Sequence, residues 1–444
     1  MAYANKQRKI KTNPAYKYYI PGLVVKMLAA VIFCFIYTFY YGYGDTVDYF
    51  VGGRSMGNLM VADFDHYMQI MLTQKQPWYY YGYFTNETGF APYFMWKDPH
   101  TFFVIKCVSL IVNIAFKSFL ATAILLAALS YVGVWKLYLF FTHYYPKMTK
   151  ELAIAVLFIP SVIFWGSGIM KDTFTFASSC WFIYSVFKIF VKKEQIPLHI
   201  FTTLITAFII LSIKPYIFVA LMPGTLIWVF YQRMRKIKSQ FFKILLFPII
   251  IIVLFGINTL LFSGIKDYLG EFGSYDNIVK RAQIIKDDLT REEQYGKNYY
   301  DVGTIGGGAG DMISSVPKAL MAGLFRPFLW EAASPVMMMS GLENTILLLL
   351  TIYLIIKIGF IKFFTQIFAD PVLVFSFTFM LFFLFGVGLA TANFGALVRY
   401  KIPAMPFFAA TLLILYGKMK EKQKDEEAER LAKRKERQQP LYPQ

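Results

Sequence analysis

Residues 20–54, IPGLVVKMLAAVIFCFIYTFYYGYGDTVDYFVGGR, decide the fold class of this chain. The first part, residues 20–41, is an apolar run as long as the ~20 residues that an α-helix needs to cross the hydrocarbon core of a bilayer. The second part, residues 43–54, follows at once and contains two carboxylates, Asp45 and Asp48. A charged side chain at the centre of a membrane helix costs about 2.5–3.5 kcal/mol on insertion scales. The two acids are therefore expected either in a solvated loop or beside a polar cleft at the membrane edge.

The composition of the whole chain agrees with a membrane protein. Of its 444 residues, 57% are hydrophobic and 16% are charged, whereas soluble domains carry about 25% charged residues. Apolar runs near 20 residues recur along the sequence, which is typical of an all-α polytopic integral membrane protein. The formal net charge of +18 does not indicate a nucleic-acid partner, because Lys and Arg cluster in short loops and tails beside apolar runs. This pattern predicts contact with membrane lipids, whose headgroups attract such basic segments.

The apolar runs predict about ten transmembrane helices. They are expected at residues 20–41, 118–141, 152–170, 173–189, 198–213, 216–231, 243–263, 344–361, 372–391 and 403–415. Because Lys and Arg favour cytoplasmic loops, the tails at residues 1–19 and 418–444 are both expected in the cytoplasm. The transmembrane domain then covers residues 20–417, with two large extracytoplasmic loops at about 43–100 and 264–343. The basic tail and the absence of eukaryotic retention signals favour a bacterial cytoplasmic (inner) membrane.

The sequence contains no familiar metal or nucleotide motif. The three cysteines lie in apolar surroundings without a CxxC spacing, and the four histidines are far apart. The glycine-rich stretch 303–310 has neither the preceding strand nor the following Lys-Ser/Thr of a P-loop. No metal ligand is therefore assigned, and whether a divalent cation takes part stays open.

Polar residues at predicted helix ends converge on the outer side of this topology. Besides Asp45 and Asp48, they are Arg54, Lys171, Asp172, Lys214, Tyr216, Arg326, Asn393, Arg399, Tyr400 and Lys401. Cations on the outer side run against the positive-inside bias. Any single one can extend its charged head harmlessly to the interface, but together they predict a cationic rim around a pocket that contains the two acids. Lys and Arg can hold a lipid phosphate, while a nearby carboxylate can act as general base for an incoming hydroxyl.

Three short motifs extend this interpretation. The first outer loop opens with an acid directly after the first helix, in Gly44-Asp45…Tyr49. A Pro-x-x-x-Phe-Trp…Gly-x-x-Lys-Asp turn at residues 160–172 joins two middle spans. A late Arg-Tyr-x-x-Pro-x-x-Pro segment at residues 399–406 opens the last span. With these features the chain resembles the polytopic glycosyltransferases of the GT-C fold, which use sugars linked to a lipid phosphate.

The resemblance implies roles for individual residues. Asp45 would be the catalytic acid of the first loop, with Asp48 as its neighbour. Lys214, Arg326 and Arg399 would bind the phosphate of the carrier. The Asp-Glu pair that is frequent in the family is absent here, because Asp45 is followed by threonine. The choice between the two aspartates and the metal dependence therefore stay open.

The sequence thus predicts a membrane glycosyltransferase. It would transfer a sugar from a polyprenyl-phosphate carrier to a glycan, lipid or protein acceptor on the extracytoplasmic face. A close variant is a polymerase of surface-polysaccharide repeat units. Two other classes stay open: a transporter of lipid-linked saccharides, which would want charged groups within its spans, and a non-catalytic scaffold that binds envelope proteins.

Overall fold

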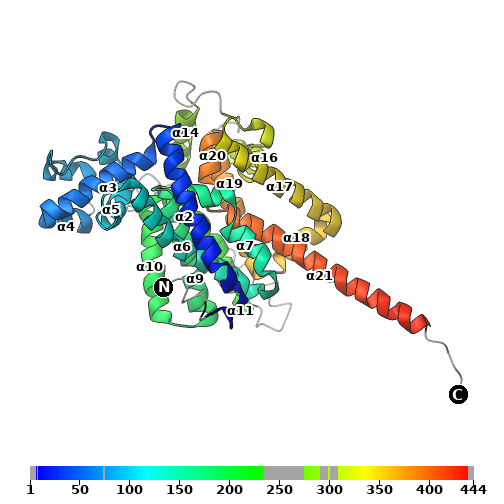
Figure 1. Cartoon of the computed structure of the whole chain (residues 1–444). Helices are drawn as coiled ribbons and strands as arrows, with labels where there is room; N and C mark the ends of the chain where they lie inside the picture. Colours follow the sequence, from blue (N-terminus) through cyan, green and yellow to red (C-terminus); the bar gives the residue numbers. More distant parts are fainter. Residues whose placement is uncertain are drawn as a thin grey trace, which may run out of the picture.

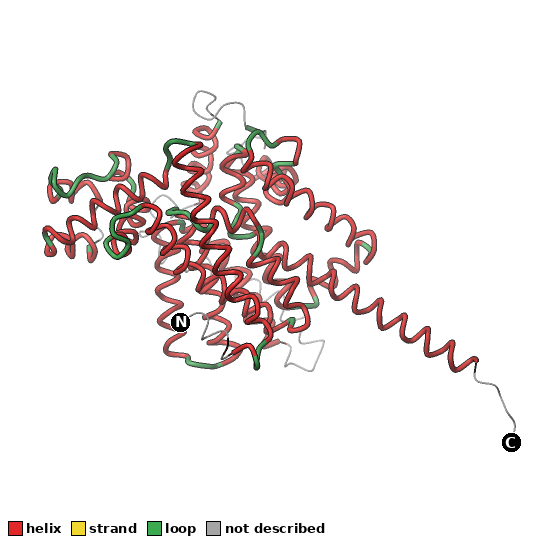
Figure 2. Tube along the Cα trace, in the orientation of Figure 1, coloured by secondary structure: helices red, strands yellow, loops and turns green. Residues whose placement is uncertain are grey.

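The chain is all-helical wherever the structure describes it. The computed structural model describes residues 7, 9–73, 76–234, 275–290, 299–300 and 309–438. Within these residues there is no β-strand, and the only strand-like pairing is an isolated bridge between Tyr299 and Asn393. Figure 2 shows helices throughout. The predicted all-α class is therefore confirmed.

The bundle begins with a long helical segment at the N-terminus. A 3₁₀ turn at Pro14–Tyr18, helix α2 at Tyr19–Phe35 and a π-helical turn at Ile36–Tyr40 form one apolar stretch of 27 residues. Helix α6 (Phe119–Tyr144) packs beside it, and the Tyr131 hydroxyl of α6 donates to the Tyr19 carbonyl at 2.8 Å. Helix α9 (Lys171–Phe187) packs on α6, and α10 (Ile196–Ile213) packs on α9.

Six helical segments of the described chain are long and apolar enough to cross a membrane. They are Pro14–Tyr40, Phe119–Tyr144, Lys171–Lys192, Ile196–Ile213, Pro335–Ile358 and Pro371–Thr391. A seventh candidate is the pair α20 (Phe394–Tyr400) and α21 (Met405–Gln438), which is bent by 69°. The chain is thus a multi-pass membrane protein. The predicted span at 243–263 lies outside the described residues, and the number ten stays a prediction.

The predicted span at residues 152–170 is not one continuous helix. Helix α7 (Thr149–Leu157) ends before Phe158, and a six-residue helix α8 follows at Pro160–Trp165. Proline lacks an N–H and disfavours helical geometry in the residue before it, so Pro160 starts a new helix rather than continuing α7. The turn after α8 leads directly into Lys171 and Asp172 at the start of α9.

Residues 45–112 form a helical subdomain beside the bundle, which we call the paddle. It contains α3 (Asp45–Ala62), α4 (Phe64–Leu72), two 3₁₀ turns (Pro77–Tyr83 and Tyr93–Lys97) and α5 (Pro99–Val112). Figure 1 shows it projecting sideways from the bundle. Gly52, Gly53 and Gly57 of α3 face successive residues of α5, so the two helices run parallel and in close contact.

The second half of the chain packs around α19 (Pro371–Thr391). Helix α11 (Pro215–Met234) lies on one side and α16 (Ala309–Phe325) on another, while α17 (Pro335–Ile358), α18 (Phe360–Phe368) and α20 complete this part. Helix α14 (Tyr275–Leu289) also contacts α19. Within the predicted outer loop at 264–343, α16 therefore packs on a core helix of the bundle, and α17 begins nine residues earlier than the predicted span.

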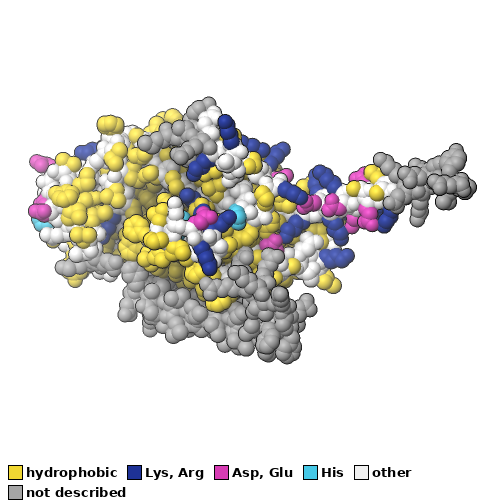
Figure 3. Space-filling model, turned by 90° about the horizontal axis from the view of Figure 1, so that it is seen from below, with side chains coloured by type: hydrophobic (Ala, Val, Ile, Leu, Met, Phe, Trp, Pro, Cys, Tyr) yellow, Lys and Arg dark blue, Asp and Glu magenta, His cyan; other side chains and the backbone are white. Residues whose placement is uncertain are grey.

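The surface separates an apolar body from a charged tail. In the view from below, hydrophobic side chains cover much of the visible body, whereas Lys, Arg, Asp and Glu follow one another along the projecting part of α21 (Figure 3). Figure 1 shows this helix running away from the bundle. The charged residues of α21 between residues 420 and 434 are exposed.

Candidate functional site

The centre of the candidate site is Asp172, a fully buried carboxylate in the first turn of α9. Its two oxygens accept from two different cations. The Lys214 ammonium donates to Oδ1 at 2.5 Å, and the Arg399 Nε donates to Oδ2 at 2.8 Å. Lys214 lies between α10 and α11, and Arg399 lies in the last turn of α20. Residues more than 200 positions apart therefore meet at one end of the bundle.

Arg399 also connects this centre to the surface. One terminal nitrogen of its guanidinium donates to Asp45 Oδ2 at 2.8 Å, and the Asp45 side chain is 51% exposed. Asp45 opens α3 after Gly44, whose φ of +151° is strained for any residue with a side chain. A Cβ on Gly44 would also lie 2.7 Å from the Tyr37 ring. The backbone at this glycine thus sets where Asp45 meets Arg399.

A third ion pair extends the cluster to the paddle. Lys171 Nζ donates to Asp98 Oδ2 at 3.2 Å, and Asp98 caps α5 by accepting from the His100 N–H at 3.0 Å. Burial disfavours the charged form of Asp98, but Lys171 and the Thr101 hydroxyl together hold its pKa below the usual value. Sequence reasoning missed Asp98, since an aspartate before a proline is an ordinary helix start.

Aromatic side chains surround these charges. The Lys214 ammonium lies 4.7 Å from the centroid of the Tyr400 ring, and Tyr216 at the start of α11 stacks on Phe383. Tyr49 of α3 is buried, and this burial, with the nearby Asp45 carboxylate, raises its pKa well above that of an ordinary phenol. The cluster contains three cations (Lys171, Lys214 and Arg399) and three carboxylates (Asp45, Asp98 and Asp172). It is therefore balanced in charge, not a purely cationic rim.

Asp48 lies one turn further along α3 and differs from Asp45. It is buried and accepts a hydrogen bond from the Tyr43 hydroxyl. Burial raises the pKa of Asp48, and the hydrogen bond to this carboxylate raises the pKa of Tyr43 to about 12. Arg54 lies two turns beyond Asp48, where its side chain is exposed and covers the Phe50 ring at 5.6 Å.

The other predicted residues belong to a second polar network. Arg326 pairs with Glu331 through two Nε contacts of 3.0 and 3.1 Å, and it lies against the rings of Tyr300 and Phe394. Lys401 is fully buried and donates to Asn344 Oδ1 at 2.5 Å and to the Arg326 carbonyl at 3.0 Å. Arg326 and Lys401 are therefore engaged with the protein itself.

Asn393 has a structural contact on each side of its amide. Its oxygen caps α20 by accepting from the backbone of residues 395 and 396, and its nitrogen donates to the Leu289 carbonyl at 3.1 Å. Of the twelve predicted residues, the structure thus joins Asp45, Lys171, Asp172, Lys214, Arg399 and Tyr400 in one cluster. It places Arg326, Asn393 and Lys401 in different contacts.

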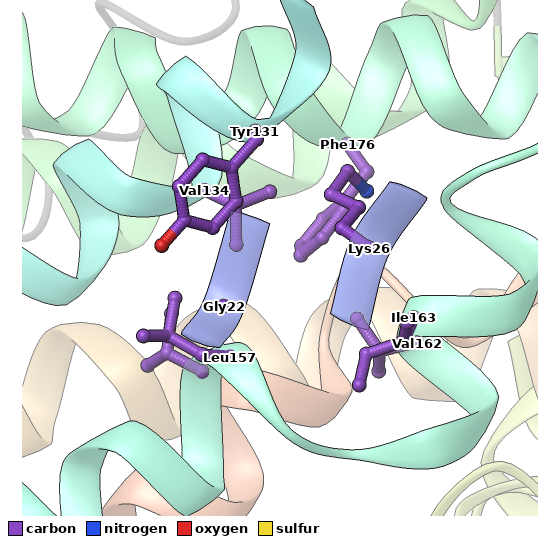
Figure 4. A pocket seen from close by; sticks show the side chains of 9 residues that line it. Gly22, Lys26, Tyr131, Val134, Leu157, Val162, Ile163 and Phe176 are labelled. Carbon is purple, nitrogen blue, oxygen red and sulfur yellow. The ribbon is translucent and has the colours of Figure 1, made fainter. Parts of the chain in front are cut away.

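The structure also reveals charged groups inside the bundle that the sequence pattern did not bring out. Lys26 of α2 is buried, and its ammonium donates to the Gly166 carbonyl at 2.5 Å. It lines a small pocket with Tyr131 of α6, Phe176 of α9 and apolar residues of α7 and α8 (Figure 4). Glu343 of α17 accepts from the Ser161 N–H at 2.7 Å. The hydrogen-bond partner of a lysine in an apolar run cannot be predicted from the sequence when that partner is a backbone carbonyl.

Among the described residues, no three His, Cys, Asp or Glu side chains lie close enough together to hold a metal ion. Comparisons with protein-family models, with curated proteins and with solved structures gave no match for this chain.

Proposed function

We propose that this protein is a membrane glycosyltransferase of GT-C type, which transfers a sugar from a polyprenyl-phosphate carrier to a glycan, lipid or protein acceptor. The observation that carries the proposal is the bridge that Arg399 makes between Asp172 and Asp45. One of these carboxylates is buried and fixed, and the other is half exposed. A carboxylate that is held by a cation at the surface of a membrane bundle is suited to act on a lipid substrate.

In the proposed reaction, the carrier phosphate replaces Asp45 on the outer edge of the guanidinium. Arg399 keeps its orientation during this exchange because its Nε stays bound to Asp172. Asp45 is then free to accept the proton of the acceptor hydroxyl, whose oxygen attacks the anomeric carbon of the sugar. The bond between that carbon and the phosphate oxygen breaks, and the polyprenyl phosphate leaves. Asp48, which is buried against Tyr43, is the less suitable base.

The proposal includes a topology of about ten spans with both termini in the cytoplasm of a bacterial cell. The cluster then faces the extracytoplasmic side, where Lys171, Lys214 and Arg399 contradict the positive-inside bias. Their pairing with three aspartates supports a role in the site rather than in topology. The repeat-unit polymerase is a variant of the same chemistry, with a glycan chain as the donor.

The test compares a deletion strain with strains that carry the wild type, Asp45→Asn or Asp65→Asn at equal expression. Asp65 is a matched control because it is an exposed carboxylate on the paddle, outside the cluster. Loss of a general base lowers the rate about 10²–10⁴-fold. We therefore expect the deletion and Asp45→Asn strains to lose a surface glycan and accumulate its lipid-linked donor, as measured by gel and mass spectrometry. A fully active Asp45→Asn strain would contradict the assignment.

A lipid-linked saccharide transporter is a second candidate, favoured by the buried side chains of Lys26 and Lys401 and the half-buried Glu343. Charged groups inside membrane bundles often mark transport pathways. The two functions differ in where the donor accumulates in the deletion strain. A transferase defect leaves the donor on the outer leaflet, where a membrane-impermeant periodate oxidises it in spheroplasts. A transport defect leaves the donor on the inner leaflet, where it is protected. An unchanged glycan in the deletion strain would favour a scaffold that binds envelope proteins.

A further inference from the structure

Among the residues that the structure describes, nothing covers the apolar side chains on one face of α5 near the end of the helix. Phe103, Cys107 and Leu110 recur every three or four residues of α5 and therefore share this face, and Ile114 follows in the turn after the helix. The opposite face, with Ile105, Val108 and Val112, is buried and packs on the glycines of α3. The side chains of Leu110 and Ile114 are 54% and 70% exposed. Exposure of these apolar side chains to water is unfavourable. We therefore expect another apolar phase or molecule to cover this face.

The apolar face of α5 is continuous with the outside of a spanning helix. Phe103 packs edge-to-face on Phe208 of α10, with 5.5 Å between the ring centroids. Towards the other end of α10, the side chains of Phe201 and Leu204 are exposed over 61% and 64% of their surface. A spanning helix with such an exposed face presents it to lipid. The lipid-facing surface of α10 is thus continuous with the exposed apolar face of α5 in the paddle.

The turn after α5 holds a large apolar side chain away from the protein. Phe116 is 92% exposed, and both Phe116 and Lys117 adopt the left-handed backbone conformation, with φ of 53° and 56°. This conformation is uncommon for residues other than glycine, and bulky residues in it are genuine outliers. Such outliers persist where the surrounding structure enforces them, and they cluster at functional positions. Here the outlier directs a phenyl ring outward beside an exposed lysine.

We propose that this surface, formed by Cys107, Leu110, Ile114 and Phe116, is embedded in the lipid of one membrane leaflet. The paddle then lies in the plane of the bilayer interface, with the Phe116 ring among the acyl chains and the Lys117 ammonium at a headgroup phosphate. It is not a domain that extends into the aqueous phase. This proposal concerns the membrane itself as partner, and it holds whatever reaction the Asp172 cluster performs.

Depth-dependent quenching in nanodiscs tests the proposal with the full chain. In a Cys107→Ser background, a small fluorophore is attached at Ile114→Cys or at Phe116→Cys. Leu204→Cys on α10 is the lipid-facing control, and Asn86→Cys in the exposed loop of the paddle is the aqueous control. We expect bromolipids to quench the labels at 114 and 116 at least half as strongly as the label at 204. Aqueous iodide should quench them several-fold less than the label at 86.

Two outcomes would overturn the proposal. Labels at 114 and 116 that respond to iodide like the label at 86, and not to bromolipid, would place this face in water. Labels that are shielded from both quenchers would show that protein covers the face, such as a second copy of the chain. The labelled positions lie on the surface, so the variants are expected to fold. The folded state of each variant is checked by its elution from a sizing column, and only folded variants are compared.

Discussion

At the scale of single residues, the candidate site depends most on Asp172. A fully buried carboxylate is expensive unless it is paired, and Asp172 has two cations within 2.8 Å. The pairing also works in the other direction, because without Asp172 the charges of Lys214 and Arg399 would be left without compensation at this depth. Asp45 differs because solvent reaches half of its surface, so it can exchange partners at low cost.

We predict that Asp172→Asn destabilises the protein far more than Asp45→Asn. Removal of one partner from a buried ion pair costs about 3–5 kcal/mol, because the other charge is left buried without compensation. An exposed pair contributes about 0–1 kcal/mol. The difference is measured by thermal denaturation of the purified variants in detergent. The fraction of protein that stays folded is followed on a sizing column. Equal shifts in the melting midpoint of the two variants would show that solvent reaches Asp172 as well as Asp45.

Tyr43 and Asp48 predict a pH dependence on the alkaline side. The pKa of Tyr43 is about 12 in the folded protein because its hydroxyl donates to Asp48, whereas an unfolded tyrosine titrates near 10. The folded state therefore holds the proton more tightly, and this contribution to stability is complete below pH 10 and is lost as the pH rises towards 12. Tyr43→Phe lacks it at every pH. The difference in stability between wild type and Tyr43→Phe should thus shrink between pH 10 and 12, measured as the difference in melting midpoint. A difference that stays constant over this range would exclude the hydrogen bond as its source.

At the scale of elements, close helix crossings replace a hydrophobic driving force, which is weak between helices in lipid. Helices α6 and α9 approach so closely at Gly133 that a Cβ there would lie 2.1 Å from the Ala177 carbonyl oxygen. The first turn of α9 carries Lys171 and Asp172, so the α6–α9 crossing also determines where these residues lie. Ala177 lies five residues after Asp172 in α9, so this close contact supports the site less than two turns away.

We expect Gly133→Val to force α6 and α9 apart. Overpacking typically costs about 1–3 kcal/mol, and the obstacle here is backbone that cannot rotate away. Gly386→Val on α19 is the matched control, because a Cβ at Gly386 meets no atom within 4 Å. The yield of folded protein and the melting midpoint should fall for the first variant and stay near wild type for the second. A comparable loss in both would point to the intrinsic helix preference of valine instead of the crossing.

At the scale of the whole molecule, the number of spans determines on which side of the membrane each terminus lies. The described chain contains six apolar helices long enough to span, or seven with the bent pair α20–α21. An even number of spans would place both ends of the chain on one side. The basic tails predict that this side is the cytoplasm.

We predict that the paddle and the two tails lie on opposite sides of the membrane. In the Cys107→Ser background, Asn86→Cys should react with a membrane-impermeant maleimide in intact spheroplasts. Lys11→Cys and Lys433→Cys, both at exposed positions, should react only after permeabilisation. Both remaining native cysteines, Cys34 and Cys180, are buried and serve as the internal background. Labelling of residue 433 from outside would exclude a cytoplasmic C-terminus.

The class of this protein and the chemical types of its candidate residues could be predicted from the amino-acid sequence. In the described part of the chain, the apolar runs are helical, with a break at residues 158–159 in one of them, because a backbone in lipid must satisfy its own hydrogen bonds. The cations at predicted helix ends could also be identified from the sequence, because charged residues are rare near apolar runs. For the same reason Asp45, Lys171, Asp172, Lys214 and Arg399 could be predicted as candidates.

Which of these candidates contact one another depends on the packing of the helices. Arg399 and Lys401 are two residues apart, yet one binds Asp172 and the other binds Asn344. Their partners lie on distant helices, and the pairing depends on how α20 is oriented against α9 and α17. The contacts of Lys26 and Asn393 with backbone carbonyls were hidden for a related reason, because every residue has a carbonyl and the sequence does not mark which one is free. Distance along the chain carries no information about such contacts, whereas helix packing does.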